Sequence, residues 1–500
     1  MAKRLKCEDI VCTYCYERFS PLKLNMHYRL ADGMVNPLHG EIPVEEEKPE
    51  EPETKEQVEN EFRISSRRTS RRSAGAVNSA AKAIKGKRLD EKLFKFYTDR
   101  MGMGATEAQS RAMQNDFVEF DVDSPDIDYD ATEWKTYGFA ENIVYKGTKL
   151  KWICPYCHNP LVSGAGKKKM LLFSVIGDTN AGKTVYFSAL QRLIGDNLLY
   201  IGNDDSDDYN FFSSGTRLPS STNTKPLPSC TMMYLQKNPE TGESEEYILI
   251  FCDIAGENCT SEEKLKRTAF NLPNSSGILF MIDPTRFETI ATILGKKTNV
   301  EEDQHRLFTA VYNFFDAGGR KLKIPTAIVI GKSDVLRKHH YFDSDEDKKQ
   351  YVLPYSESGK ENIVDLNVTD KVDEVTRGFL KTIGKGVYNS NVDMIFDNKK
   401  YFLVSSLGYD PEREGDGNAI MPNRVEEPFM WLLFQNDAAY SHHSEKYTYR
   451  ATGIKLMNTK LNKGIFSKIK GKEVEKDISF YYRKSEFETK LAQKRNEEAE

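Results

Sequence analysis

The segment from Gly177 to Thr184 has the residues and the spacing of a phosphate-binding loop. It reads GDTNAGKT, fits G-x-x-x-x-G-K-[ST], and joins an apolar run to a stretch with helical spacing. Gly177 and Gly182 allow a tight turn whose backbone N–H groups, with the positive end of the helix dipole, face phosphate oxygens. Lys183 would place a point charge on the β- and γ-phosphates, and the Thr184 hydroxyl would bind Mg²⁺. The sequence therefore predicts a nucleoside triphosphate site, to which the remaining loop residues also belong: Asp178, Thr179, Asn180 and Ala181.

A second strand end carries the residues that such a site needs around the metal ion. The run ILIFCDIAG leads into Asp253, three residues before Gly256. In this position the carboxylate would hold Mg²⁺ through water, and the Gly256 N–H would reach the γ-phosphate. A Thr that binds Mg²⁺ and the γ-phosphate is expected in GTRLPSSTNTKPLP, where distance from the next strand favours Thr222 or Thr224 without separating them.

A third and a fourth strand end predict the base. In IVIGKSD, Asp334 would accept hydrogen bonds from N1–H and the 2-amino group of guanine, and the stem of Lys332 would lie over the ring. Adenine lacks that pair of donors, and a buried acceptor left unmet discriminates strongly. The motif departs from the usual pattern, because Gly331 stands where Asn or Thr is usual. In LVSSLG, Ser405 and Ser406 would close the base pocket.

Two pairs of cysteines have the spacing of metal-binding knuckles. Cys12-Thr-Tyr-Cys15 and Cys154-Pro-Tyr-Cys157 are CxxC pairs, and together they provide four thiolates for a tetrahedral Zn²⁺ site. Zinc ribbons usually separate the pairs by about 15–20 residues, and here the gap is far longer. We interpret residues 41–88, an acidic and then basic block, as a disordered insertion, because loop closure cost grows only slowly with length. One structural zinc ribbon is therefore predicted, in preference to a redox role.

The elements that must position these residues follow an α/β pattern. Apolar runs begin at Met170, Thr231, Tyr247, Gly277, Thr326 and Tyr401, with helical stretches between most of them. Strands that alternate with helices predict a doubly wound, mostly parallel sheet. The stretch EEPFMWLLFQ from Glu426 is expected to be the last helix of this domain, and SEFETKLAQKRNEEAE a helix at the end of the chain.

Composition restricts the class of protein. The chain has 500 residues, a net charge of −5, 29% charged residues and a mean hydropathy of −0.61. These values predict solvated stretches beside a folded region and no global attraction for nucleic acid or anionic membranes. The start lacks an apolar signal region, and the longest apolar runs are far short of the about 20 residues that span a bilayer. We expect a cytoplasmic protein without a transmembrane segment, whose cysteines are reduced or bind metal.

The ordered set GDTNAGKT, DIAG, GKSD and SSL resembles the TRAFAC-class, Ras-like P-loop GTPases from about Lys169 to Asn436. The CxxC pair before the loop and the EEPFMWLL helix are more narrowly similar to the bacterial double-GTPase-type proteins. This resemblance implies a GTP/GDP switch with Mg²⁺, a protein partner, and a setting in phage defence or other conflict. The expected domains are 1–40 for the first half of the ribbon, 41–88 for the disordered insertion, and 89–166 for a helical and loop segment with the second half of the ribbon. Residues 167–440 are expected to form the GTPase and 441–500 a charged tail.

Two residues suggest that catalysis departs from the usual Ras-like arrangement. Glu257 stands where a Gln commonly orients the attacking water, so hydrolysis is expected to be slow or to need a partner. Asn180 matches GTPases that bind K⁺ beside the phosphates, where the ion supplies the charge of an arginine finger. The alternative is that Asn180 only tolerates the backbone angles of the loop. Lys183, Asn180 and Glu257 are therefore the catalytic candidates.

Three hypotheses follow for function. The first is a GTP-hydrolysing switch with a zinc module, whose partner binds the switch face or that module. The second is a nucleotide-dependent scaffold with little hydrolysis, motivated by Glu257, and the third is an ATP-using P-loop enzyme. The basic run RRTSRR could attract nucleic acid, but it lacks aromatic residues and follows an acidic block, so we favour a protein partner.

Overall fold

The computed structural model describes most of the chain in two compact units. The larger unit comprises Glu8–Phe19 with Gly164–Glu500, and the smaller comprises Met1–Cys7 with Ser20–Ser163. The described residues are 5–22, 27–30, 89–113, 117–119, 125–177, 181–201, 229–254, 265–266, 268–269, 271–295, 309–315, 321–353, 363–384, 386–409, 420–450 and 473–499. The predicted disordered insertion, residues 41–88, lies outside them.

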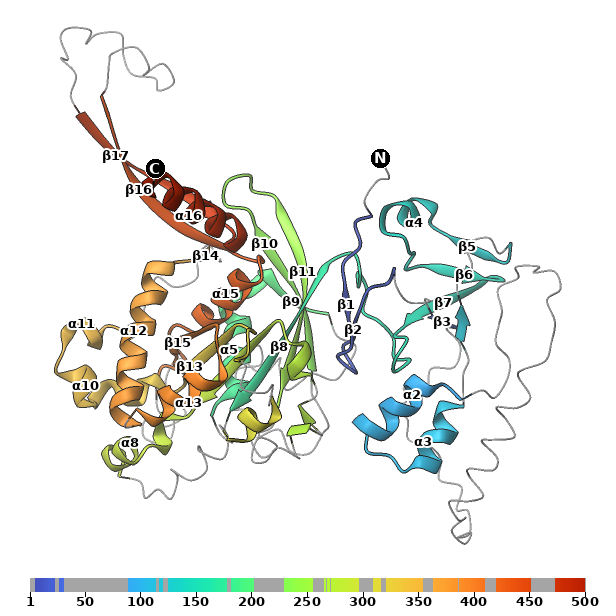
Figure 1. Ribbon diagram of the computed structural model, residues 1–500, viewed down its shortest axis with the longest axis horizontal. Helices are drawn as coiled ribbons and strands as arrows, with labels where there is room; N and C mark the ends of the chain where they lie inside the picture. The colour runs from blue at the N-terminus through green and yellow to red at the C-terminus, as the bar shows by residue number, and fades with distance from the viewer. Residues whose placement is uncertain are drawn as a thin grey trace. The chain divides into compact units, whose positions relative to one another are not determined.

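The smaller unit is built on a five-stranded antiparallel sheet of order β4-β3-β7-β6-β5 (Figure 1). Its strands are β3 (His27–Leu30), β4 (Phe117–Glu119), β5 (Ile127–Tyr129), β6 (Ile143–Tyr145) and β7 (Thr148–Ile153). Its helices are α2 (Glu91–Lys95), the π-helical η1 (Phe96–Arg100), α3 (Ala105–Ala112) and α4 (Ala131–Tyr137). Tyr28, Phe139 and Trp152 form an aromatic core, and the buried Tyr28 hydroxyl donates to the Ala140 carbonyl at 2.8 Å.

The larger unit contains a seven-stranded sheet of order β15-β13-β12-β8-β11-β10-β9. Its strands are β8 (Lys169–Gly177), β9 (Leu198–Tyr200), β10 (Ser229–Lys237), β11 (Ser244–Asp253), β12 (Gly277–Ile282), β13 (Thr326–Ile330) and β15 (Lys399–Leu403). The five strands from β15 to β11 are parallel, whereas β10 and β9 are antiparallel to their neighbours. The apolar runs are continuous because parallel strands are buried on both faces. The predicted doubly wound, mostly parallel sheet is confirmed.

Helices cover both faces of this sheet. On one face, Phe187 of α5 (Lys183–Ile194) and Phe429 of α15 (Glu426–Gln435) pack against Phe251, with ring centroids 4.9 and 5.9 Å away. On the other face, Phe396 at the end of α13 (Val387–Ile395) packs against Phe280. Helices α5 and α15 begin and end where the apolar spacing predicts. None of the helices in the described part of the chain is long and apolar enough to cross a membrane.

A hairpin near the C-terminus was not predicted from the sequence. Strand β16 (Tyr440–Arg450) pairs with β17 (Glu473–Tyr482) and with β14 (Ile363–Val364), and Figure 1 shows the hairpin extending from the unit beside α16 (Lys484–Ala499). Polar residues and tyrosines make up β16, and β17 begins with a charged stretch, which hides the strand signal. The remaining helices are η2 (Gly195–Asn197), η4 (Leu272–Asn274), η5 (Pro284–Arg286), α8 (Glu288–Ile293), η6 (Ser333–Lys338), α10 (His340–Asp343), α11 (Glu346–Lys349) and α12 (Leu366–Ile383).

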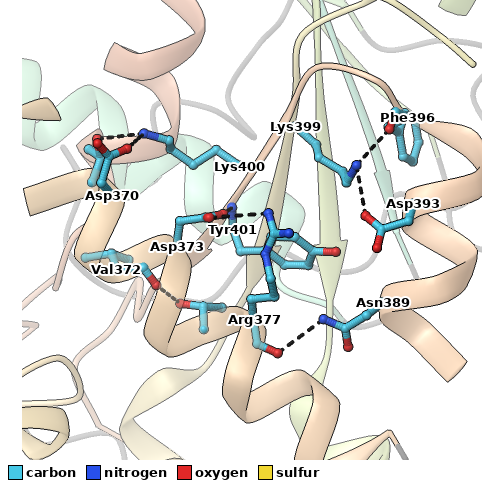
Figure 2. A network of polar contacts seen from close by, with 12 residues as sticks. Asp370, Val372, Asp373, Arg377, Asn389, Asp393, Phe396, Lys399, Lys400 and Tyr401 are labelled. Atoms are coloured by element: carbon cyan, nitrogen blue, oxygen red, sulfur yellow. Dashed lines mark hydrogen bonds and ion pairs between the residues drawn. The ribbon is translucent and has the colours of Figure 1, made fainter. Parts of the chain in front are cut away.

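Helix α12 protects the edge of the seven-stranded sheet (Figure 2). β15 is the edge strand, and its Tyr401 N–H donates to the Asp373 carboxylate at 2.7 Å. Arg377 lies 5.0 Å from the Tyr401 ring centroid and contacts the same carboxylate. Burial raises the pKa of Asp373, and the hydrogen bond from Tyr401 and the nearby cations only partly offset this. An unpaired N–H at a sheet edge is thus satisfied by a side chain, which also blocks pairing with another strand.

Replacing Asp373 by alanine is expected to lower the free energy of unfolding by about 1–2 kcal/mol, because the Tyr401 N–H loses its acceptor. Asp373→Asn is the matched control, since its amide oxygen can still accept that hydrogen bond. Urea unfolding of the two variants and the parent checks this. Equal losses in both variants would mean that the carboxylate charge, and not the hydrogen bond to Tyr401, stabilises the edge.

Candidate nucleotide-binding site and cysteine cluster

The predicted nucleotide-binding residues lie at one edge of the seven-stranded sheet. Strands β8, β11, β12, β13 and β15 are parallel, so their carboxyl ends meet at the same edge. Gly177 ends β8 and Asp253 ends β11, while Lys332 and Ser405 follow β13 and β15. Ligands of open α/β sheets bind outside the carboxyl ends of the strands. The topology therefore brings together residues that are more than two hundred positions apart in the sequence.

In the described parts of the phosphate-binding loop, both glycines of the motif stand where the backbone requires glycine. A Cβ at Gly177 would stand 2.3 Å from the carbonyl oxygen of Met281, so only glycine fits beside β12. Gly182 has a φ of 86°, in the left-handed region that favours glycine, and it caps α5. Lys183 is 7% exposed, and its ammonium donates to the Gly177 carbonyl at 3.2 Å. The ammonium is thus directed back towards the carboxyl end of β8.

Asp253 and Thr184 form the part of the site that suits Mg²⁺. The Thr184 hydroxyl lies 3.4 Å from Asp253 Oδ2, and Asp253 is 3% exposed. Its other carboxylate oxygen, Oδ1, is buried without a hydrogen-bond partner among the described residues. Burial raises the pKa of Asp253, whereas the charge of Lys183 and the hydrogen bond from Thr184 lower it. The unpaired carboxylate oxygen of Asp253 and the Thr184 hydroxyl beside it are hard oxygen ligands, and they suit a magnesium ion that keeps several waters.

On the opposite side of this edge, Asp334 is held by the loop that follows β15. The Ser405 hydroxyl donates a short hydrogen bond to Asp334 Oδ1 and accepts one from the Gly408 N–H at 2.9 Å. Ser405 is buried, and its backbone pairs with Asn423 in both directions. Ser406, the other predicted pocket residue, is half-buried beside it. The Ser405 hydroxyl therefore fixes the orientation of the Asp334 carboxylate, as an acceptor for a base requires.

Sequence reasoning missed two residues that hold the predicted base-binding loops. Asp283, directly after β12, accepts a hydrogen bond from the Lys332 ammonium at 2.7 Å. Arg337 donates to the Gly408 carbonyl at 2.8 Å and to the Val352 carbonyl at 3.1 Å. An Asp at the end of the apolar run GILFMI was a signal available in the sequence, because carboxyl ends of the strands meet at this edge. No comparable signal marks Arg337.

Several predicted site residues lie outside the part of the chain that the structure describes. They are Asp178, Thr179, Asn180, Thr222, Thr224, Gly256 and Glu257. Ala181 is described and buried in the loop. The potassium, switch and water-orienting roles of these residues therefore stay predictions.

A family model decides what kind of domain this is. Residues 171–369, from β8 into α12, match the model of the Double-GTPase 2 family. This part of the chain is similar to the Double-GTPase 2 family. The matched range contains the loop lysine, the β11 aspartate and the GKSD motif, and it ends before Ser405. The resemblance to P-loop GTPases of the double-GTPase type is thus confirmed.

Solved structures of other GTPases are similar to parts of this chain. Era of Aquifex aeolicus, bound to GDP and AlF4⁻, is 15% identical over 49% of this chain and 54% of its own, with a TM-score of 0.22. The GTP-bound GTPase-like domain of Ski7 from S. cerevisiae is 12% identical over 56% and 55%, with a TM-score of 0.24. The signal recognition particle receptor SRb-GTP/SRX complex of Chaetomium thermophilum is 14% identical over 49% and 94%, with a TM-score of 0.22. The match spans about half the length of the Era and Ski7 chains, and no curated protein matches this chain.

The four predicted zinc ligands come together. The sulfur atoms of Cys12, Cys15, Cys154 and Cys157 all lie within 4.8 Å of one another, and all four residues are buried. Among the described residues this is the one group of three or more His, Cys, Asp or Glu side chains that could hold a metal ion. The cluster is compatible with a zinc module, and the long sequence gap between the pairs does not prevent it.

The two cysteine pairs have the same local geometry. In the first, the Tyr14 N–H donates to Cys12 Sγ at 3.4 Å, and in the second the Tyr156 N–H donates to Cys154 Sγ at 3.4 Å. The residue after each second cysteine, Tyr16 or His158, has a φ of 57° and closes a turn onto the carbonyl of the first cysteine. Backbone N–H groups directed at sulfur favour the thiolate form that a metal ion needs.

Side-chain contacts hold each knuckle. The first knuckle lies between β1 (Ile10–Val11) and β2 (Arg18–Phe19), and the Asn274 amide donates to the Tyr16 carbonyl at 3.0 Å. The Arg18 guanidinium donates to Ser276 Oγ at 3.2 Å, so this hairpin is joined to the segment that enters β12. The second knuckle is held by an ion pair of 3.2 Å between His158 and Asp90, the N-cap residue of α2.

The surroundings of Asp90 favour its charged form and lower its pKa. Burial alone would raise the pKa of Asp90, but hydrogen bonds from His158 and from the backbone N–H groups of Leu93 and Lys92 lower it overall. His158 is therefore committed to a structural carboxylate, and it is outside the four-cysteine cluster.

The first turn of α15 contains a buried acid whose charge depends on pH near neutrality. Burial raises the pKa of Glu427 to about 7, and the charge of Glu426 adds to this, although Arg424 opposes it. Arg424 and Glu427 form a short ion pair and are both nearly excluded from solvent. The charge of Asp365, the N-cap residue of α12, also raises the pKa of Glu427.

We expect Glu427 to make the protein less stable as pH rises from about 4.3, its unfolded pKa, towards 7. The native state binds the proton more tightly than the unfolded state in this window, so the contribution of the group falls with increasing pH. The Glu427→Gln variant lacks this dependence, and its stability relative to the parent should rise between pH 5 and pH 8 by on the order of 1–3 kcal/mol. Denaturant unfolding at both pH values measures the difference, and a constant difference would contradict the raised pKa.

Proposed function

We propose that this protein is a GTP-binding and GTP-hydrolysing molecular switch that works in the cytoplasm with a protein partner. The observation that carries the proposal is the placement of two complementary groups at one sheet edge. Lys183, Thr184 and Asp253 suit a Mg²⁺-bound triphosphate, and Lys332 with Asp334 suits a guanine base. The match to the Double-GTPase 2 family supports the same conclusion.

Each residue has a defined task in this proposal. The backbone N–H groups from Gly177 to Thr184 and the Lys183 ammonium bind the phosphates. Thr184 and Asp253 hold Mg²⁺, which neutralises charge on the β- and γ-phosphates when it is bound. Asp334 accepts from the base, and Ser405 and Ser406 border its pocket. The Mg²⁺-binding Thr222 or Thr224, the Gly256 N–H, and the catalytic candidates Asn180 and Glu257 complete the site.

Single-turnover hydrolysis of GTP separates the switch from the scaffold. The purified chain is mixed in excess with GTP and Mg²⁺, and the release of phosphate is followed. Phosphate release by the chain alone, however slow, supports an enzyme. Tight GTP binding with no release favours the scaffold, for which Glu257 in place of Gln is the specific reason. Comparing KCl with NaCl in the same assay tests Asn180, since equal rates would exclude a potassium ion.

We also propose that the four cysteines bind one structural Zn²⁺. Cys154→Ser is expected to lower the zinc content well below one ion per chain after dialysis against a competing chelator, because structural zinc sites use four protein ligands and the variant has three thiolates. Cys7→Ser is the matched control, since Cys7 lies outside the cluster. Elemental analysis after the same dialysis measures both. Full zinc content in Cys154→Ser would contradict the assignment.

A role in bacterial defence follows from the sequence resemblance and is part of the proposal. Phage plating on cells that carry the parent gene or the Lys183→Ala variant tests it. Protection that requires Lys183 would support a nucleotide-dependent defence function, and equal plating in both strains and in cells without the gene would contradict it.

A further inference from the structure

Asp283 is a buried carboxylate at the sheet edge that the proposed function has not used. It follows β12 directly, and its side chain is 3% exposed. Oδ1 accepts from the Thr285 N–H at 2.9 Å and from the Thr285 hydroxyl at 2.7 Å, while Oδ2 accepts from the Lys332 ammonium at 2.7 Å. Both oxygens are therefore fixed, one by a turn of its own chain and one by a residue of the GKSD motif.

The partner of this carboxylate, Lys332, is held in an unusual conformation. Its φ is 50°, in the left-handed region that a lysine adopts at a cost, and it caps η6, which begins with Ser333 and Asp334. The Lys332 side chain is 37% exposed although its ammonium is bound to Asp283. The charged end is thus anchored in the protein while part of the aliphatic stem remains accessible, which is the arrangement that a stacked base needs.

Gly331 explains why such an anchor is needed in this chain. Related motifs have Asn or Thr at this position, and here no side chain can tie the loop to its neighbours. A Cβ at Gly331 would stand 3.1 Å from the carbonyl oxygen of Ala181, in the phosphate-binding loop. The backbone of Gly331 donates to the Ile282 carbonyl at 3.0 Å, next to Asp283. The ion pair between Lys332 and Asp283 therefore links the GKSD loop to the residue that follows β12.

We infer that Asp283 is a positioning residue for base recognition, which holds Lys332 so that its stem faces the ring and its ammonium stays away from Asp334. This inference rests on the proposed function. Without Asp283, the closest carboxylate to Lys332 along the sequence is that of Asp334, two residues later. A lysine that paired there would neutralise the group that reads the base. Asp283 thus keeps the acceptor of the pocket available and the stacking surface in place.

Equilibrium binding of GDP to the full chain tests this with a double-mutant cycle. Asp283→Asn is expected to weaken GDP binding about tenfold, and Lys332→Met to weaken it by a similar factor. If Asp283 acts through Lys332, the double variant binds no more weakly than Lys332→Met alone. Inorganic triphosphate, which lacks a base, is the second probe, and its binding should be unchanged because it contacts only the phosphate-binding loop. A purely structural role for Asp283 would weaken both probes.

Two further variants complete the design. Glu288→Gln removes an exposed carboxylate five residues later and should leave GDP binding unchanged. Thr285→Val removes one hydrogen bond to Asp283 and should weaken GDP binding by a few fold, so it replaces Asp283→Asn in the cycle if that variant does not fold. Parent-like GDP binding by Asp283→Asn, or losses that add in the double variant, would overturn the inference alone. A parent chain that binds no guanine nucleotide would overturn the proposed function as well.

Discussion

Replacement of Lys183 by alanine is expected to weaken GTP binding at least 100-fold and to stop hydrolysis. The ammonium is buried and donates to the Gly177 carbonyl at the end of β8. A bound triphosphate would replace that contact with charge-assisted bonds to two phosphates, each worth about 1.5–3 kcal/mol. Their loss corresponds to about 3 kcal/mol, or two powers of ten in affinity. Titration with a fluorescent guanine nucleotide in the presence of Mg²⁺ measures this.

Arg192→Ala is the matched control for Lys183. Arg192 lies in the last turn of the same helix, α5, and is exposed, so the variant removes one positive charge at the opposite end from the phosphates. Its nucleotide affinity should stay within about twofold of the parent, since exposed charges beyond a Debye length are largely screened. An affinity of Lys183→Ala within threefold of the parent would show that this loop does not bind the phosphates.

Replacement of Asp334 by asparagine is expected to weaken GDP binding about 100-fold and to improve binding of xanthosine diphosphate. The carboxylate accepts from two N–H donors of guanine, whereas an asparagine amide would set its own N–H against one of them. A buried donor left without an acceptor costs about 1–3 kcal/mol. Xanthine carries a carbonyl at the 2-position, which can accept from that amide. Competition titrations with the two diphosphates check both changes.

Asp343→Asn serves as the control for this exchange, because Asp343 is an exposed acid in α10 of the same region. It should leave the ratio of the two affinities as in the parent. If Asp334→Asn binds GDP as well as the parent does, the assignment of Asp334 to the base is wrong, even if the phosphate site is correct.

The fold could be predicted from the sequence because its signals are local and repeated. Continuous apolar runs such as MLLFSVIG and GILFMI identify strands buried on both faces, and each ends at a Gly or an Asp that a strand end explains. Once the strands are parallel, their carboxyl ends must meet, so the order of the motifs already implies that Lys183, Asp253 and Asp334 share one edge. The structure confirms the doubly wound sheet on which that argument rests.

Long-range side-chain contacts could not be predicted in the same way. The ion pair of Asp283 with Lys332 joins residues 49 positions apart, and the contact of Arg337 with Gly408 joins residues 71 apart. Neither pair belongs to a sequence motif, and many other acids and bases have similar local sequences. The β16–β17 hairpin was missed for another reason: β16 consists of polar residues and tyrosines and β17 begins with a charged stretch, so the period-2 alternation of a half-buried strand is hidden.

The cysteine cluster lies between these two cases. The CxxC spacing alone identifies each knuckle, because the geometry of the turn and its N–H···S bonds is local. That the two knuckles meet could be inferred only from the chemistry of zinc, which needs four ligands. The structure places the four sulfur atoms together, whereas the metal itself remains a proposal.

Competition between GTP and ATP for the full chain shows which base the site prefers. A labelled guanine nucleotide is bound in the presence of Mg²⁺, and each triphosphate is titrated against it. We expect GTP to displace the label at a concentration at least about 100-fold lower than ATP does, because adenine offers Asp334 no matching pair of donors. Equal displacement by the two triphosphates, or no binding of guanine nucleotide at all, would contradict this expectation.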